Sequence, residues 1–412
     1  MIFKSVFMPI FVQILSATYN LYKMWIKREI ESELQDIALQ YPVVMITGPR
    51  QAGKTSLAKK TFPDKPYYSL ENPDVREQIS ADPRAFFSAN PDGAVIDEFQ
   101  RYPDILSYIQ GIVDEKKQKG QFILTGSNNL SMLNFVTQSL VGRVALLKLL
   151  PFTIGEVSGV NRDFNIDDYL LNGFYPGIYS EGLNPVKAYR NYYETYVERD
   201  IRQLIQIKDL IYFQRFVKLC AGRVGQLFNA SSLATEIGVS AQTIHAWLSV
   251  LQATFIVFMV QPWSVNISKR MVKTPKLYFY DVGLASYLLG IENVNHITTH
   301  PLRGALFENM VILELLKKRF NAGLDSNLYF YRDNHGNEVD VLQESGYQLN
   351  LFEIKSGQTF TSHFLKGLDY LRKLIPDRIL SSNLVYAGDQ EMTINGHDIW
   401  NYRNVNAKDV IV

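Results

Sequence analysis

The period of the hydrophobic residues divides this chain into three parts. Residues 25–40 repeat apolar side chains at helical spacing, and from there to about residue 155 short apolar runs alternate with amphipathic stretches. Such runs, separated by helices, are typical of a parallel sheet with helices on both faces. From about residue 155 the pattern is mainly helical, and from about residue 302 strand-like runs return. The pattern predicts an α/β fold, a helical middle region and a second α/β region.

Three apolar runs in the first α/β region predict buried strands. The runs are "VVMITG" at 43–48, "AVIDEFQ" at 94–100 and "QFILTGS" at 121–127. The segments "KTSLAKKTF" at 54–62 and "DILSYIQGIVDEKKQ" at 104–118 have the helical period. We therefore expect one parallel sheet in which helices connect successive strands.

The middle region contains the layout of a winged helix-turn-helix, which is a helix, a tight turn at Gly238, a second helix and then a strand. No lysine or arginine occurs from 224 to 268, although DNA contact needs cations. DNA contact through a wing is one interpretation, and the apolar stretch after Trp247 favours the other, a packing module between domains. Cations return where the wing would lie, at Lys269, Arg270, Lys273 and Lys276.

Composition and charge narrow the function classes. The chain has 412 residues, 47% of them hydrophobic and 20% charged, which is ordinary for a protein of two or three domains. A formal net charge of +1 excludes a whole-protein field that would draw it to nucleic acid or acidic lipid, so such a contact needs a local patch. The single cysteine, Cys220, excludes an internal disulfide and fits a reducing cytoplasm.

The segment "GPRQAGKT" fits the phosphate-loop pattern G-x-x-x-x-G-K-[ST]. It lies between a predicted strand and a predicted helix, which is the context this motif requires. Its glycines let the backbone wrap phosphates, which then meet N–H groups at a helix start. Lys54 would contact the β- and γ-phosphates of ATP, and Thr55 would hold Mg²⁺. The predicted ATP contacts are Gly48, Pro49, Arg50, Gln51, Ala52, Gly53, Lys54, Thr55 and Ser56.

Acidic and polar residues end the two strands that follow. Asp97 is placed to bind the Mg²⁺ shell together with Thr55, and Glu98 to polarise the attacking water. Ser127 and Asn128 end the next strand, where they would sense the γ-phosphate or simply form a polar turn. ATP and Mg²⁺ are the expected cofactors, and ATP hydrolysis is the expected activity.

Arg143 follows the third strand in "SLVGRVALLKLLPF". Across a subunit boundary it would act as an arginine finger that stabilises charge in the transition state. That role implies a homo-oligomer, whereas a monomer is also compatible with this class of ATPase. The alternative for Arg143 is a surface position or a structural ion pair.

The first residues differ from the rest. Residues 1–23 join an early lysine to a short apolar stretch, the outline of a signal peptide, but the stretch contains Pro9 and is too short to span a bilayer. Met24 opens an amphipathic segment. We expect residues 1–23 to be an extension outside the core, with a membrane anchor as the alternative. Unless they are an anchor, no stable membrane association is expected, and the use of ATP predicts a cytoplasmic protein.

Near the C-terminal end, "NEVDVL" and "FEIKSG" carry acids on successive predicted strands. Glu353 and Lys355 share one face of their strand because side chains alternate. With Asp340 they form an acid-x₁₂-acid-x-lysine arrangement, as in nucleases of the restriction-endonuclease fold, where acids hold Mg²⁺ and the catalytic lysine positions or deprotonates water. Glu308 on an upstream helix would add a metal ligand, with Glu314 as its substitute. The alternative is a set of ion pairs, such as Asp340 with Lys355.

These motifs together resemble a known family. "GPRQAGKTSLA", "VIDEFQRYPDIL", "FILTGSNNL", "LVGRVALLKLLPFTIGE", "GFYPGIY", "GALFENMVILEL", "NEVDVL" and "EIKSG" look like the prokaryotic AAA+-type ATPases that carry a restriction-endonuclease-like C-terminal domain of unknown function. The resemblance covers roughly residues 25–390. It implies an ATP-binding protein with a helix-turn-helix between its ATPase and C-terminal domains, and the family's biological role is largely undefined.

We expect four segments: an extension (1–23), an ATPase domain (24–155), a helical and winged helix-turn-helix region (156–300), and a restriction-endonuclease-like domain (301–412). The leading hypothesis is an ATPase whose hydrolysis rearranges the C-terminal domain. One alternative is a Mg²⁺-dependent nuclease that ATP licenses to cut. Another is a non-enzymatic regulator, in which ATP sets the state of a DNA- or protein-binding module. DNA or a protein is the expected further partner.

Overall fold

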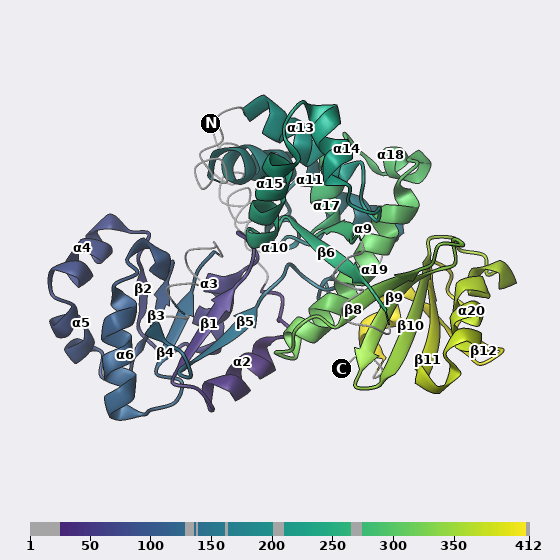
Figure 1. Ribbon diagram of the computed structural model, residues 1–412. Coiled ribbons are helices and arrows are strands. Elements are labelled where there is room, and N and C mark those ends of the chain that lie inside the picture. Colours follow the sequence, from purple (N-terminus) through teal and green to yellow (C-terminus); the bar gives the residue numbers. More distant parts are fainter. Residues whose placement is uncertain are drawn as a thin grey trace, which may run out of the picture.

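The computed structural model describes residues 25–127, 136, 139–160, 164–200, 210–264 and 274–408. Several segments for which we made predictions lie outside the described residues: 1–23, Asn128, and the wing cations Lys269, Arg270 and Lys273. Figure 1 shows a parallel sheet at one end, a helical region in the middle and a second sheet at the other end. The long helix α19 (Arg303–Asn321) runs between the helical region and the second sheet.

Five short strands form the first sheet, and all of them are parallel. The three predicted strands are β1, β3 and β4, and β2 and β5 add to them. Their order is β2-β3-β4-β1-β5, so β4 lies between the strand that leads into the phosphate loop and the strand that ends in Asp97. The strands are β1 (Val43–Thr47), β2 (Tyr67–Ser69), β3 (Ala94–Asp97), β4 (Phe122–Thr125) and β5 (Val144–Lys148).

Helices cover both faces of this sheet. One hydrophobic cluster joins Leu34 and Leu57 to one face, and another joins Ile79 and Ile109 to the opposite face. This two-sided burial explains why the strands are continuous apolar runs. The helices are α2 (Glu31–Ala38), α3 (Lys54–Thr61), α4 (Pro73–Ala81), α5 (Pro83–Ala89) and α6 (Ile105–Lys116).

The middle region is helical, as its period predicted. Gly238, at φ 89°, ends α14 and permits the tight turn into α15. Trp247 on α15 is buried against Phe213 and Phe216 of α13, with ring centroids 5.5 and 5.6 Å away. The region contains α8 (Ile154–Ser158), α9 (Ile166–Asn172), α10 (Pro176–Ser180), α11 (Pro185–Tyr192), a π-helical segment (Tyr193–Asp200), α13 (Leu210–Ala221), α14 (Ala230–Ile237), α15 (Ala241–Ala253), α17 (Val282–Leu288) and α18 (Val294–Thr299).

The second sheet has the order β12-β13-β11-β10-β9-β8-β6-β7 and crosses the boundary we predicted at residue 300. Strands β6 and β7, which follow the helix-turn-helix layout, pair with each other, and β6 also pairs with β8. The strands are β6 (Val257–Pro262), β7 (Lys276–Phe279), β8 (Leu328–Arg332), β9 (Glu338–Ser345), β10 (Gln348–Lys355), β11 (Ile379–Tyr386), β12 (Met392–Ile394) and β13 (His397–Asn401), with α20 (Lys366–Leu374) between β10 and β11.

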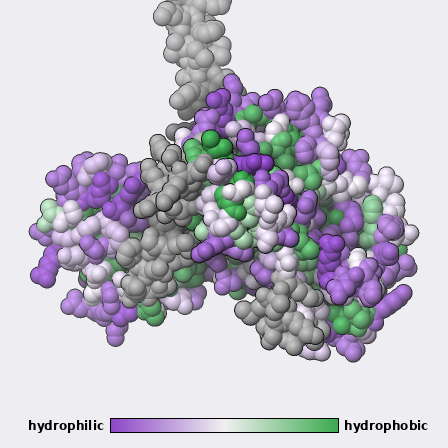
Figure 2. Space-filling model, turned by 45° about the horizontal axis from the view of Figure 1, so that its top comes forward, coloured by the Kyte–Doolittle hydropathy of each residue, from purple (hydrophilic) through white to green (hydrophobic). Residues whose placement is uncertain are grey.

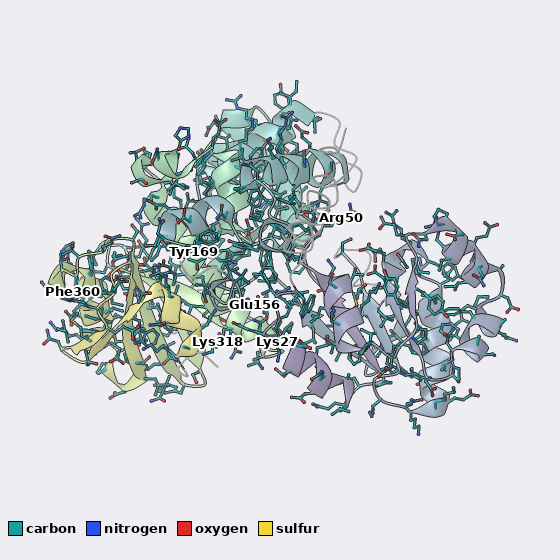
Figure 3. All side chains as sticks on the ribbon, turned by 180° about the vertical axis from the view of Figure 1, so that it is seen from behind. Lys27, Arg50, Glu156, Tyr169, Lys318 and Phe360 are labelled. Carbon is teal, nitrogen blue, oxygen red and sulfur yellow. The ribbon has the colours of Figure 1, made fainter. Side chains whose placement is uncertain are left out.

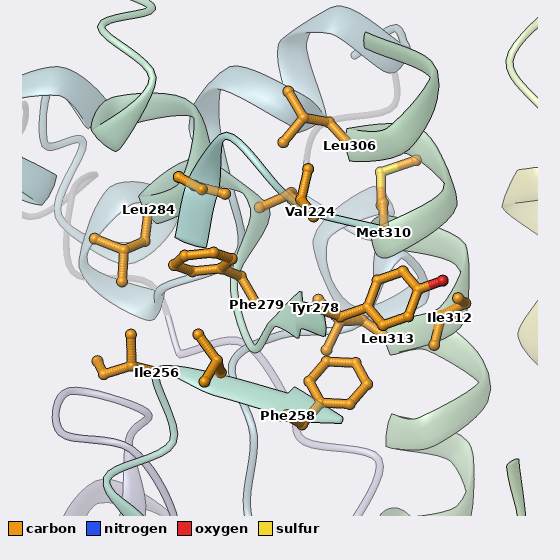
Figure 4. Packing of buried hydrophobic residues seen from close by; sticks show 14 of the residues in the cluster. Val224, Ile256, Phe258, Tyr278, Phe279, Leu284, Leu306, Met310, Ile312 and Leu313 are labelled. Carbon is orange, nitrogen blue, oxygen red and sulfur yellow. The ribbon is translucent and has the colours of Figure 1, made fainter. Parts of the chain in front are cut away.

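The largest hydrophobic core joins the middle region to this sheet. Figure 4 shows Phe258 of β6 and Tyr278 of β7 beside Ile312 and Leu313 of α19, and Phe279 near Leu284. Most of α19 is buried, which accounts for its apolar side chains on nearly every face.

At the surface, Figure 2 shows hydrophilic side chains predominating on the visible face, with hydrophobic ones in small patches between them. Among the described residues, we find no helix with the length and apolar character needed to cross a membrane.

Candidate nucleotide site and C-terminal acid cluster

The phosphate loop joins β1 to α3, where the sequence placed it. Gly48 has φ 149°, and a Cβ there would lie 2.0 Å from the carbonyl oxygen of Leu149. Gly53, at φ 92°, is the N-cap residue of α3. Both positions therefore require glycine, and the loop's N–H groups are gathered at a helix start, where phosphate is favoured.

Lys54 crosses the inside of this loop. Its Nζ atom donates to the carbonyl oxygens of Gly48 (3.1 Å) and Pro49 (2.7 Å), and the side chain is buried. Burial lowers the pKa of Lys54 to about 8, although the carboxylates of Glu98 and Asp97 oppose this shift. The ammonium thus lies where loop-bound phosphate would meet it.

Asp97 collects hydroxyl donors at the end of β3. Its carboxylate accepts from the Oγ1 atom of Thr55 at 2.9 Å, from the hydroxyl of Tyr67 at 2.8 Å and from the hydroxyl of Thr125. Burial and this hydrogen bond raise the pKa of Tyr67 to about 12, so Tyr67 stays a donor. Thr55 and Asp97, the predicted Mg²⁺ ligands, do come together, and a hydroxyl beside a carboxylate fits that hard cation.

Glu98 stands beside Lys54 in a strained conformation. Its backbone is left-handed, with φ 54°, which is costly for a residue with a side chain. Gln100 donates to the Oε2 atom of Glu98 at 2.5 Å and to Ser127 at 3.3 Å. Burial raises the pKa of Glu98, while Lys54 lowers it. Ser127 is thereby connected to Glu98 through Gln100, a residue that the sequence analysis did not single out.

A cavity of about 580 Å³ opens over the loop. Its first wall consists of loop residues together with Glu71 and Glu98, and its second wall comes from α10 and the residues after it. The second wall comprises Pro176, Gly177, Ser180, Glu181 and Leu183. The segment "GFYPGIY" contributes part of this wall. No local sequence pattern predicts that it folds back over the loop.

Arg143 lies far from the cavity of its own chain. It directly precedes β5, and its carbonyl oxygen accepts from Val43 at the start of β1, whereas the phosphate loop follows the end of β1. A five-residue strand spans about 16 Å. The guanidinium instead pairs with Asp114, with Nε 2.5 Å from Oδ1. The ion-pair alternative is therefore what the chain shows, and an arginine finger stays a prediction for contact between protomers.

The C-terminal acids come together partly as predicted. Strands β9 and β10 are antiparallel neighbours and bring Asp340 beside Glu353 and Lys355. The Nζ atom of Lys355 lies 2.5 Å from Glu353 and 3.3 Å from Asp340, and Asp340 also accepts from the backbone of Ile354 at 2.8 Å. Burial, with the charge of Asp340, raises the pKa of Glu353 to about 8.

Lys276 enters this cluster, contrary to its predicted place on an exposed wing. It is 3% exposed, and its Nζ atom lies 2.6 Å from Glu338 and 3.3 Å from Glu308. Tyr278, two residues along β7, donates to Glu308 at 2.5 Å. Burial, with the charge of Asp340, raises the pKa of Glu308 to about 7. The charge of Lys276 and the hydrogen bonds from Tyr278 and Lys276 oppose this rise.

The three predicted metal ligands, Glu308, Asp340 and Glu353, thus lie beside two lysines of the chain, and a metal site there stays a prediction. In the part of the chain that the structure describes, no three acidic, histidine or cysteine side chains gather in a way that could hold a metal ion. Two ammonium groups, from Lys276 and Lys355, lie among the carboxylates instead. As they are arranged, Glu308 and Glu353 are paired with these cations of the protein's own.

Glu314, the predicted substitute for Glu308, lies elsewhere. It is 1% exposed and pairs with Lys317, whose Nζ atom is 2.9 Å away.

Comparisons with known proteins agree with the loop geometry. Residues 40–158 match a family described as an AAA domain, and residues 163–295 and 303–405 match two domains of unknown function, DUF8612 and DUF4143. Two uncharacterized proteins, Rv2008c of Mycobacterium tuberculosis and Mb2031c of Mycobacterium bovis, are each 32% identical to the chain over 337 residues, which is 81% of this chain and 74% of each relative. The chain belongs to the same family as these two proteins.

Solved structures are similar to this AAA-domain protein at a lower level. The Walker-type ATPase PABY2304 of Pyrococcus abyssi is 14% identical, with a TM-score of 0.44, and the match covers 64% of this chain and 96% of that one. The AMPPCP-bound DnaA of Aquifex aeolicus is also 14% identical, with a TM-score of 0.30, over 54% of this chain and 85% of that one.

We predict that ATP binding takes up a proton at alkaline pH. Above about pH 8 the Lys54 side chain of the free loop is largely neutral, and bound phosphate raises its pKa, so binding must protonate it. The affinity for ATP should fall by up to about tenfold per pH unit above 8. Calorimetry in two buffers of different ionisation enthalpy should show little proton uptake at pH 7 and uptake of close to one proton at pH 9. The control variant Lys60→Ala, on the same helix, should give the same values as the wild-type chain. No uptake at pH 9 would contradict this role of Lys54.

We predict that Lys276→Met destabilises the fold by about 3 kcal/mol, since it leaves the buried Glu308 without its cation. Chemical denaturation should show this loss of the free energy of unfolding. Arg332→Met is the matched control, because Arg332 lies 3.6 Å from Glu338 but is about half exposed, so its loss should cost at most about 1 kcal/mol. Equal effects of the two substitutions would show that Lys276 has no special place in the cluster.

Proposed function

We propose that this protein binds ATP with Mg²⁺ at the phosphate loop, hydrolyses it, and uses the cycle to rearrange its helical and C-terminal regions. One observation carries the proposal: Lys54, Thr55 and Glu98 line one cavity at the carboxyl ends of β1 and β3. Asp97 lies directly beside it and accepts a hydrogen bond from Thr55 at 2.9 Å. Ligands bind at this edge in open parallel sheets. The AAA domain matched over residues 40–158 supports the same activity.

Each side chain in the cavity has a task that its geometry suits. Lys54 neutralises charge on the β- and γ-phosphates, and Thr55 and Asp97 would hold Mg²⁺, which would offset charge on the phosphate groups. Glu98 accepts a hydrogen bond from the attacking water, and its raised pKa makes it a better proton acceptor than an ordinary carboxylate. Gln100 and Ser127 keep the Glu98 carboxylate in place.

We propose a rearrangement of the helical region relative to the phosphate loop, because residues of both line the cavity. Its second wall is α10 and the residues after it, in the helical region. Arg50 of the loop also stacks over the ring of Tyr196, 5.2 Å from its centroid, in the same region. A nucleotide that contacts both walls stabilises one of their relative positions, and loss of the γ-phosphate removes part of that preference.

The burial of Trp247 and Lys276 bears on which partners the middle and C-terminal regions can bind. Because Trp247 is buried on α13 and Lys276 is buried in the acid cluster, neither is free to meet DNA. We therefore propose that the α14–α15 unit is a packing module, with a protein as the further partner. The four-segment division, with its winged-helix and restriction-endonuclease-like parts, belongs to this proposal.

A nucleotide-gated nuclease is the second candidate. It is favoured by the meeting of Asp340, Glu353 and Lys355 on β9 and β10, and by the Oε2 atom of Glu353, which is buried without a hydrogen-bond partner among the described residues. The position of Lys276 weighs against it, because that ammonium already compensates Glu308.

Two substitutions test the ATPase. Lys54→Ala should weaken ATP binding at least about a hundredfold, since it removes the cation that faces the phosphates. Glu98→Gln should bind ATP normally but turn it over at least about a hundredfold more slowly, because the general base is lost. Fluorescent-nucleotide titration and phosphate release measure the two effects, with Lys60→Ala as the control. Turnover that survives both substitutions would overturn the proposal.

A cleavage assay separates the second candidate. We expect no cutting of plasmid or single-stranded DNA by the wild-type chain with Mg²⁺ or Mn²⁺, with or without ATP, beyond that of Asp340→Ala. The nuclease would instead be supported by cleavage that Asp340→Ala and Lys355→Ala abolish, while Asp377→Ala, an exposed acid, leaves it unchanged.

A further inference from the structure

Arg28, which precedes α2, binds the phosphate loop without lining the nucleotide cavity. The side chain is 4% exposed, and its Nη1 atom donates to the carbonyl oxygen of Ala52 in the loop at 2.9 Å. Its Nη2 atom donates to the carbonyl oxygen of Leu150 at 2.7 Å, and its Nε atom pairs with Glu156 at 3.0 Å. A buried guanidinium with three such partners fixes their relative positions.

Glu156 connects this arginine to the start of α8. Its Oε2 atom accepts from the backbone of Thr153 at 2.8 Å, and Thr153 caps the helix in return. Its Oε1 atom also accepts from the backbone of Glu29 at 2.7 Å. Figure 3 shows Glu156 at the junction between the N-terminal part and the rest of the molecule. Its carboxylate is therefore satisfied only while Arg28 and α8 keep their places.

From α8 the hydrogen bonds continue to α19. The backbone N–H of Ile154 donates to the Oε2 atom of Glu314 at 2.8 Å. Glu314 pairs with Lys317, which donates to the carbonyl oxygen of Phe152 at 2.5 Å. Both charged side chains are 1% exposed. A second branch runs from Thr153 to the Glu29 carboxylate at 2.8 Å and from there to Asn321 at the end of α19 at 3.1 Å.

The same helix also carries the acid cluster. Glu308 lies six residues before Glu314 on α19 and holds Lys276 and Tyr278 of the β6–β7 hairpin. The first half of α19 thus carries Glu308 of the acid cluster. The second half carries Glu314, which is connected to the phosphate loop through α8 and Arg28. Since each buried polar group must keep a partner, a shift of the loop is followed by a shift of α19.

We infer that Arg28 is a positioning residue of the phosphate loop, and that the path from Ala52 through Arg28, Glu156 and Glu314 transmits the position of the loop to α19. The inference rests on the proposed function, because it names the route by which bound nucleotide changes the C-terminal region. It adds a second route beside the α10 wall, which leaves the loop through the backbone carbonyl of Ala52.

Hydrogen exchange on the full-length chain tests the path. In the Glu98→Gln background, amide exchange of α19 should differ between the ATP-bound and ADP-bound protein. Glu314→Gln should keep the affinity for ATP within about threefold and lose most of that difference. Arg28→Met should raise the Kd for ATP about tenfold and lose the difference, and Arg28→Lys, which keeps one donor, should restore part of both. Arg319→Gln, on the same helix but outside the path, should change neither.

Stability is checked separately by the melting temperature. If Glu314→Gln does not fold, the double variant Glu314→Gln/Lys317→Met replaces it, because removing both partners of a buried pair leaves no uncompensated charge. Variants that bind ATP and keep the full exchange difference in α19 would overturn the inference, as would a wild-type chain that binds ATP with no response in α19. Absence of ATP binding by the wild-type chain would overturn the proposed function as well.

Discussion

A charge buried without a partner costs several kcal/mol, and this constraint governs each place where the parts of the chain meet. Arg28 and Glu156 lie 3.0 Å apart between the phosphate loop and α8. Glu314 and Lys317 lie 2.9 Å apart between α8 and α19. Lys276 of β7 lies between Glu308 of α19 and Glu338 of β9. Because none of these groups can lose its partner cheaply, the junctions specify the arrangement of the sheets around α19.

The constraint also gives the two sites different characters. At the nucleotide site, Lys54 donates to carbonyl oxygens and Asp97 accepts from hydroxyl groups, so a phosphate and a cation can take over these contacts. In the acid cluster, the carboxylates are already compensated by Lys276 and Lys355. Ligands can therefore replace the hydrogen-bond partners of Lys54 and Asp97 at the nucleotide site, whereas the ion pairs of the acid cluster stay in place.

The sequence predicted what depends on local order and left out what depends on distant contacts. The phosphate loop and the approach of Thr55 to Asp97 follow from strand, loop and helix in succession, which periodicity and glycine positions reveal. The wall supplied by α10, the hydroxyl of Tyr67 and the pairing of β6 with β8 join segments far apart in the chain, and no local pattern marks them. Lys276 was misplaced for a related reason: a lysine in a basic run is usually exposed, and only the fold brings Glu308 and Glu338 to it.

The central claim is that the nucleotide cycle changes the position of the C-terminal region relative to the AAA domain. It is tested most directly by the distance between spin labels at Glu115→Cys on α6 and Lys373→Cys on α20, both exposed, with Cys220→Ala and Glu98→Gln in the background. Pulsed electron spin resonance should give different distance distributions for the ATP-bound and ADP-bound protein. Superimposable distributions, in a variant shown to bind both nucleotides, would contradict the account.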